Sequence, residues 1–125
     1  MTDRLLRAVA NPWVDVLGHP MGRLILKREA HKADMTHVMA AAAAAGVLLE
    51  INAQIDRLDL DDLHARRARD AGARIVISSD AHSTAGLGAL RWGVTVARRA
   101  WLTPDDVVNT RSVDAFRAAL RRNQS

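Results

Sequence analysis

The fold is indicated most clearly by residues 47–52, which read Val47-Leu48-Leu49-Glu50-Ile51-Asn52. This run is almost continuously apolar, as expected of a strand buried on both faces. An Ala-rich segment, residues 35–45, comes just before it, with Asp34 placed as an N-cap and Gly46 as a helix stop. A helix that leads directly into a buried strand is the repeating unit of a parallel sheet.

Two further strands are predicted on either side of this one. The first is the apolar stretch 13–17, which ends at Gly18-His19-Pro20, and the second is residues 74–78, followed by the loop Ser79-Asp80-Ala81-His82-Ser83. The predicted fold class is therefore α/β, with about three parallel strands and covering helices. A doubly wound sheet and a part of a β/α barrel both fit this pattern.

The remaining segments are assigned to loops and helices. Residues 21–33 are expected to form a loop, and Asp61 begins a helix that should run to Ala71. Later helices are expected over 87–100, with an interruption near Gly93, and over 113–121. Thr103-Pro104 between them has the composition of a helix start.

The composition bounds the function. The chain has 125 residues, enough for a single domain over 1–125, and a formal net charge of +4. A basic surface suits nucleic acid, although scattered arginines are also ordinary. Cysteine is absent, so a metal would need His, Asp or Glu ligands. No signal-peptide pattern or membrane-length apolar run is present, so we expect a cytoplasmic protein without a membrane partner.

Polar residues follow each predicted strand. His19 follows the first, Glu50 and Asn52 lie at the end of the second, and Asp80 with His82 follows the third. The carboxyl ends of parallel strands meet on one face, where active sites are built. Carboxylate oxygen with imidazole suits Zn, Mn or Fe, which would activate water for hydrolysis. Simpler roles stay open: a helix cap for Asp80, a turn residue for His19 and an arginine partner for Glu50.

Arginine and tryptophan residues supply the other candidates. Arg23 and Arg57 lie in loops after strands, where they could hold the phosphate oxygens of a substrate. The tryptophans, Trp13, Trp92 and Trp101, are expected to be packing residues rather than platforms for stacked bases.

Several strings, taken in order, resemble the C-terminal half of a PHP (polymerase and histidinol phosphatase) domain, most closely the version attached to bacterial family X DNA polymerases. The matching strings are Gly18-His19-Pro20, Leu49-Glu50-Ile51-Asn52-Ala53, Ser79-Asp80-Ala81-His82-Ser83 and Ala97-Arg98-Arg99-Ala100-Trp101-Leu102. The resemblance extends from about Asn11 to Ala119 and implies part of a distorted seven-stranded barrel with metal ions at the strand ends.

The resemblance also implies site residues and an activity. His19, Asp80 and His82 correspond to metal ligands, and Glu50 and Asn52 correspond to a strand end that lines the pocket. Members of the family hydrolyse phosphoesters, and the polymerase-linked version is associated with 3′→5′ exonuclease activity, which would connect this chain with DNA repair. The family's N-terminal His-x-His motif is not found here. We therefore expect an N-terminally truncated domain that needs the missing half of its barrel or a second chain.

Three functions fit these residues. The first is a fragment of a metal-dependent phosphoesterase, with nucleic acid or another phosphoester as substrate. The second is a non-catalytic module that binds nucleic acid or a partner protein and keeps only the remnant of the fold. The third is a hydrolase of the histidinol-phosphatase or amidohydrolase type.

Overall fold

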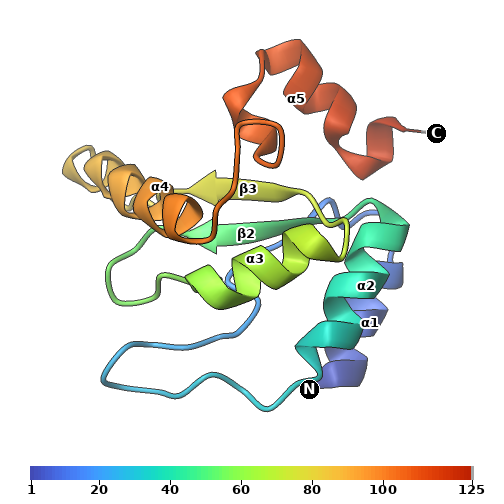
Figure 1. Ribbon diagram of the computed structural model, residues 1–125, viewed down its shortest axis with the longest axis horizontal. Coiled ribbons are helices and arrows are strands. Elements are labelled where there is room, and N and C mark those ends of the chain that lie inside the picture. The colour runs from blue at the N-terminus through green and yellow to red at the C-terminus, as the bar shows by residue number, and fades with distance from the viewer. Residues whose placement is uncertain (125) are drawn as a thin grey trace.

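The computed structural model describes residues 1–124, whose core is a three-stranded parallel sheet (Figure 1). Its strands are β1 (Val16–Leu17), β2 (Leu48–Asn52) and β3 (Ile75–Ser78), in the order β1-β2-β3. In the register, Leu17 lies beside Leu49 and Asn52 beside Ser78. The predicted α/β class is confirmed, and one open parallel sheet with surrounding helices is consistent with part of a barrel.

Five α-helices and three short 3-10 helices surround the sheet within residues 1–124. The α-helices are α1 (Thr2–Ala10), α2 (Met35–Ala45), α3 (Asp62–Asp70), α4 (Leu90–Arg99) and α5 (Val113–Ala119). The 3-10 helices are η1 (Ala85–Ala89), η2 (Val108–Thr110) and η3 (Arg121–Asn123). Among these residues, no helix is long and apolar enough to cross a membrane.

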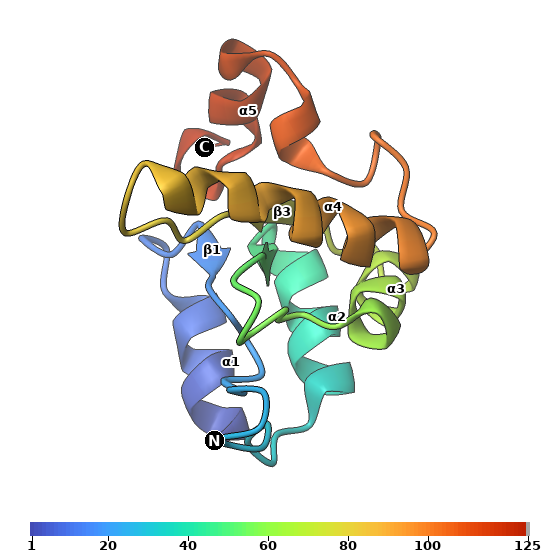
Figure 2. The same cartoon turned by 90° about the vertical axis from the view of Figure 1, so that its left-hand side faces the viewer.

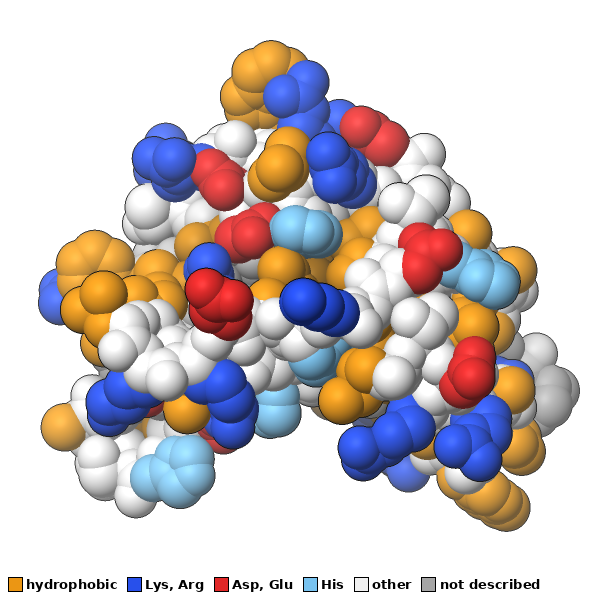
Figure 3. Space-filling model, turned by 90° about the horizontal axis from the view of Figure 1, so that it is seen from below, with side chains coloured by type: hydrophobic (Ala, Val, Ile, Leu, Met, Phe, Trp, Pro, Cys, Tyr) orange, Lys and Arg blue, Asp and Glu red, His pale blue; other side chains and the backbone are white. Residues whose placement is uncertain are grey.

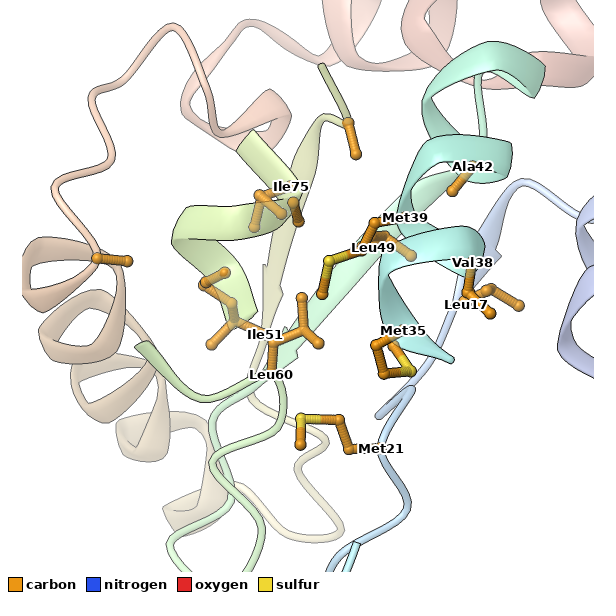
Figure 4. Close-up of a cluster of buried hydrophobic side chains, with 14 of the residues drawn as sticks. Leu17, Met21, Met35, Val38, Met39, Ala42, Leu49, Ile51, Leu60 and Ile75 are labelled. Carbon is orange, nitrogen blue, oxygen red and sulfur yellow. The ribbon is translucent and has the colours of Figure 1, made fainter. Parts of the chain in front are cut away.

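The alternation of side chains along the strands divides the core into two parts. On one face, Leu49, Ile51 and Ile75 pack against helices α1 to α4, as Figure 4 shows for the central cluster. On the other face, Leu48 and Val76 pack against residues of η2 and α5. Glu50 and Asn52 share the face of Leu48 but lie further along β2, so this face changes from apolar to polar toward the strand ends.

The outer edge of β3 is covered by the segment after α4. Ile75 donates its backbone N–H to the carbonyl of Asp106 at 3.0 Å. The side-chain amide of Asn109 takes the place of a neighbouring strand in the hydrogen-bond pattern. It accepts the N–H of Ile77 at 3.1 Å and donates to the carbonyl of Ile77 at 2.7 Å. This edge of the sheet is therefore covered by the Asn109 side chain and by the turn that contains Asp106, not by another strand.

The N-terminal expectations were partly wrong. The strand predicted over 13–17 is reduced to Val16–Leu17, and Trp13 is 81% exposed in the turn before it. Helix α1 was not predicted at all. Its signal was the spacing of Leu5, Leu6 and Val9, which places apolar side chains on the face that packs against the core.

Two expectations for the later helices were also wrong. Helix α4 continues through Gly93, because this glycine is the point where the helix lies closest to Ile77 and Ala53. Thr103-Pro104 begins a turn rather than a helix. The N–H of Thr103 donates to the Asp106 carboxylate at 2.7 Å, which closes the turn locally.

The tryptophans do not serve mainly as packing residues. Trp92 is 38% exposed and Trp101 63% exposed, in addition to the exposed Trp13. Two of them carry an arginine over the ring: the guanidinium carbon of Arg66 lies 3.6 Å from the ring centre of Trp101, and that of Arg91 lies 4.7 Å from Trp92. These contacts have cation–π geometry.

Asp61 is the N-cap of α3, and its replacement should weaken the fold in a pH-dependent way. Its carboxylate accepts both the backbone N–H and the ring Nδ1 of His64 at 2.8 Å. Burial alone would raise the Asp61 pKa, but the bonds and charge of His64 outweigh it and hold the pKa below 3.8. The stabilisation is thus present above about pH 3.8 and lost as the pH falls further.

We expect Asp61→Ala to lower the free energy of unfolding at neutral pH by about 0.5–2 kcal/mol. Asp61→Ser keeps a capping oxygen that does not titrate, so it should cost less and lose the acid dependence. Urea unfolding at several pH values measures both effects. An equal loss in the two variants would show that the cap is not the source of the stabilisation.

Candidate functional site

The polar residues predicted at the ends of β2 and β3 lie together. Figure 2 looks onto the carboxyl ends of the strands. The amide Nδ2 of Asn52 donates to Oδ2 of Asp80 at 3.0 Å and lies 3.4 Å from Oε2 of Glu50. One buried amide therefore joins a carboxylate from β2 to a carboxylate from the loop after β3. The carboxylates of Glu50 and Asp80 thus lie near each other, and the neutral Asn52 amide orients them.

His19 is tied to the same cluster through its backbone. Its N–H donates to Oε2 of Glu50 at 2.7 Å, while its side chain is exposed at the end of β1. The residue has φ +29°, a conformation that tight turns impose. The three strand ends are thus connected through Glu50 and Asn52, with the imidazole of His19 on the outside.

Gln54 anchors the loop that carries Asp80. Its side-chain amide donates to the carbonyl of Ser79 at 2.6 Å and to that of Asp80 at 3.0 Å. Its backbone N–H donates to the side-chain oxygen of Asn52 at 3.1 Å. Sequence analysis missed Gln54, because a glutamine in a loop gives no signal until its partners are known.

His82 is oriented by its own loop. Its Nδ1 lies 2.7 Å from the carbonyl oxygen of Asp80, and a carbonyl can only accept, so Nδ1 carries the proton. The lone pair of the imidazole is therefore on Nε2, and the side chain is exposed. Histidines that bind metals are commonly fixed in this way by a backbone carbonyl.

The donor types fit a divalent metal ion, but they do not converge on one point. Glu50 and Asp80 offer carboxylate oxygens, and His19 and His82 offer imidazole nitrogens, a mixture that suits Zn, Mn or Fe. Within residues 1–124, no three His, Asp or Glu side chains are gathered closely enough to hold an ion. The described chain therefore presents suitable ligands without a complete coordination shell.

Arg23 and Arg57 connect two loops. Nε of Arg23 donates to the carbonyl of Arg57 at 2.7 Å, and its Nη2 donates to that of Leu58 at 2.6 Å. Nη1 of Arg57 lies 3.4 Å from the carbonyl of Arg23. Both guanidinium groups thus bind backbone oxygens. Only their remaining N–H groups could bind a phosphate.

Asp59 is a buried acidic residue beside Asn52 that was not predicted from the sequence. Its side chain is fully buried, and Oδ1 accepts the N–H of Met21 at 3.1 Å. Burial raises the pKa of Asp59, although the N–H groups of Met21, Gly22 and Arg23 and the Arg23 charge act against this. Among the described residues, Oδ2 has no hydrogen-bond partner. Asp59 therefore holds the loop that begins at His19.

Comparison with known proteins finds relatives that are named as probable phosphatases. It is 30% identical over 115 residues to a probable phosphatase of Thermoanaerobacter sp. (strain X514), covering 87% of this chain and 44% of that protein. It is 26% identical over 129 residues to a probable phosphatase of Caldanaerobacter subterraneus, covering 98% and 48%. No protein-family model matches the chain.

A further similarity is to a polymerase. The chain is 38% identical over 120 residues to the DNA polymerase/3′-5′ exonuclease PolX of Bacillus subtilis, a match that covers 96% of this chain but 21% of the polymerase. The chain thus spans about a fifth of this relative and less than half of the two phosphatases. Together these matches support the resemblance to part of a PHP-type phosphoesterase.

Proposed function

We propose that the chain is the C-terminal part of a metal-dependent phosphoesterase of the DNA 3′→5′ exonuclease type. The observation that carries this proposal is the cluster at the strand ends. Asn52 joins the carboxylates of Glu50 and Asp80, and the neighbouring His82 is fixed with Nε2 available for a ligand. The similarity to a polymerase named for its 3′-5′ exonuclease supports the choice of DNA.

Each residue has a role in this proposal. His19, Asp80 and His82 would hold the metal ion, which supplies Lewis acidity for the hydrolysis of a phosphoester. Asn52 holds the two carboxylates in place. Glu50 fixes the backbone of His19 and would line the substrate pocket. The N–H groups of Arg23 and Arg57 that do not bind loop carbonyls would contact the phosphate.

The proposal includes a partner. Since the described residues do not gather a complete set of ligands, further ligands would come from polypeptide outside this chain. The donor would be the N-terminal half of the barrel or a second chain. A cytoplasmic location belongs to the same proposal, because the polymerase relative is named for work on DNA.

Metal content after gentle purification tests the proposal. We expect the wild-type chain to hold Zn, Mn or Fe and the double variant Asp80→Ala/His82→Ala to lose it. His37→Ala/Asp105→Ala is a matched control, because it removes the same two side-chain types from exposed positions outside the polar cluster at the carboxyl ends of the strands. A folded wild-type protein without metal, or a control that loses metal equally, would contradict the proposal.

A non-catalytic nucleic-acid-binding module is the second candidate. It is favoured by the net charge of +4 and by the absence of a gathered ligand set among residues 1–124. Figure 3 shows acidic and basic side chains interspersed on the face it views, so that face is not a uniformly basic surface. Salt-sensitive DNA binding without metal would favour this candidate. Release of phosphate from histidinol phosphate, or cleavage of an amide, would instead favour the other hydrolase types.

A further inference from the structure

A shallow hollow of about 420 Å³ borders the candidate site and shares Gln54 with it. It is formed where the loop after β2 faces η1 and the beginning of α4. The residues that define it are Gln54, Ile55, Gly86, Gly88, Arg91 and Trp92.

The hollow and the candidate site meet at Gln54. Gln54 lines the hollow and also donates to the backbone carbonyls of Ser79 and Asp80. Trp92 is held in position because its neighbour Gly93 lies against Ile77 and Ala53, which fixes this turn of α4 on the sheet. A ligand in the hollow would therefore lie beside Gln54, which anchors the loop that carries Asp80.

The chemistry of the walls favours a planar, negatively charged ligand. Trp92 and Ile55 stay 38% and 64% exposed, so apolar surface faces solvent here. Arg91, whose guanidinium lies over the Trp92 ring, adds a positive charge at the same place. Above Gly88, the space that a side chain would fill is open. An aromatic ring beside an arginine suits single-stranded nucleic acid, since bases stack on aromatic rings and phosphates bind cations.

We propose that this hollow is a base-binding subsite, in which Trp92 stacks on a nucleobase of a single-stranded substrate while Arg91 contacts its phosphate. The inference rests on the proposed function and deepens it, because it names a single strand as the substrate. It gives Trp92 and Arg91 a role in substrate binding that is separate from the metal ligands.

Binding of a fluorescein-labelled oligothymidylate tests the subsite, with an abasic oligonucleotide of equal length as the second probe and chelator present to prevent hydrolysis. Stacking contributes about 1–3 kcal/mol per base, so Trp92→Ala should weaken thymidylate binding about 5- to 150-fold. Its effect on the abasic strand should be much smaller. Trp92→Phe should restore most of the affinity, and Trp101→Ala, which removes the other arginine-paired ring, should leave the affinity unchanged.

Tryptophan fluorescence gives a readout that does not depend on the alanine variant folding. Oligothymidylate should quench the tryptophan fluorescence of the wild type. The Trp92→Phe variant should lose most of that quenching, because the ring that contacts the base no longer fluoresces as tryptophan. The inference is overturned if Trp92→Ala weakens both probes equally, if Trp101→Ala has the same effect, or if the wild type binds neither probe. Metal uptake by the wild type without Trp92-dependent binding would refute the subsite alone. Trp92-dependent binding by a wild type that takes up no metal when chelator is left out would refute only the metal-dependent function.

Discussion

Replacing Gly93 with alanine is expected to lower the free energy of unfolding by about 1–3 kcal/mol, the usual effect of forcing an extra carbon into a packed core. A Cβ at this position would lie 2.5 Å from Cγ2 of Ile77 and 3.0 Å from Cβ of Ala53. Ile77 belongs to β3 and Ala53 follows β2, so neither can move without disturbing the sheet. Urea unfolding measures the loss.

The sign of this effect is informative. In a helix, glycine to alanine ordinarily stabilises by about 0.5–1 kcal/mol, because alanine loses less backbone entropy on folding. Gly88→Ala is the matched control, since a Cβ there meets no atom within 4 Å. We expect that variant to be neutral or more stable. If Gly93→Ala were as stable as Gly88→Ala, the inferred close contact between Gly93 of α4 and the sheet would be contradicted.

Replacing Asp59 with alanine is expected to destabilise the protein by about 1–3 kcal/mol, because the buried N–H of Met21 would lose its acceptor. Asp59→Asn keeps an oxygen in the same place and should cost less. The loss should be greatest near His19, since Asp59 holds that loop. Hydrogen exchange at Met21 and Gly22 should therefore be faster in Asp59→Ala than in Asp59→Asn, and equal rates would contradict this role.

The same carboxyl group should make stability depend on pH. Because burial raises the Asp59 pKa above 3.8, the folded state binds this proton more tightly than the unfolded state. The free energy of unfolding therefore falls as the pH rises from about 3.8 through the folded-state pKa, opposite in sign to the effect of Asp61. Subtracting the pH profile of Asp59→Asn from that of wild type, over about pH 3.5 to 7, should isolate this decline. A flat difference would show that burial does not shift this group.

The candidate site could be predicted from sequence only where residues belong to strand ends. Glu50, Asn52 and Asp80 follow apolar runs, and parallel strands bring such residues together whatever the details of packing. Gln54 and Asp59 could not be found in this way. They act through bonds to the backbone of Ser79, Asp80 and Met21, and those bonds exist only once two loops are folded against each other.

The tryptophans show the same limit. A sequence gives their apolar character, which favours burial, but not the faces that helices and turns present to solvent. Gly93 faces the sheet, and Trp92, one residue earlier on α4, is directed partly to solvent with its ring beside Arg91.

By itself, the sequence determined the α/β class, the three strands and the polar residues at their ends, because hydrophobic runs and helix signals are local properties of the chain. The tertiary structure alone decided how those polar groups are used. It joined Glu50 to Asp80 through Asn52, tied Arg23 to backbone carbonyls and left His82 with Nε2 available. Such choices depend on distances between residues far apart in sequence, which only the packing of loops and helices around the sheet can set.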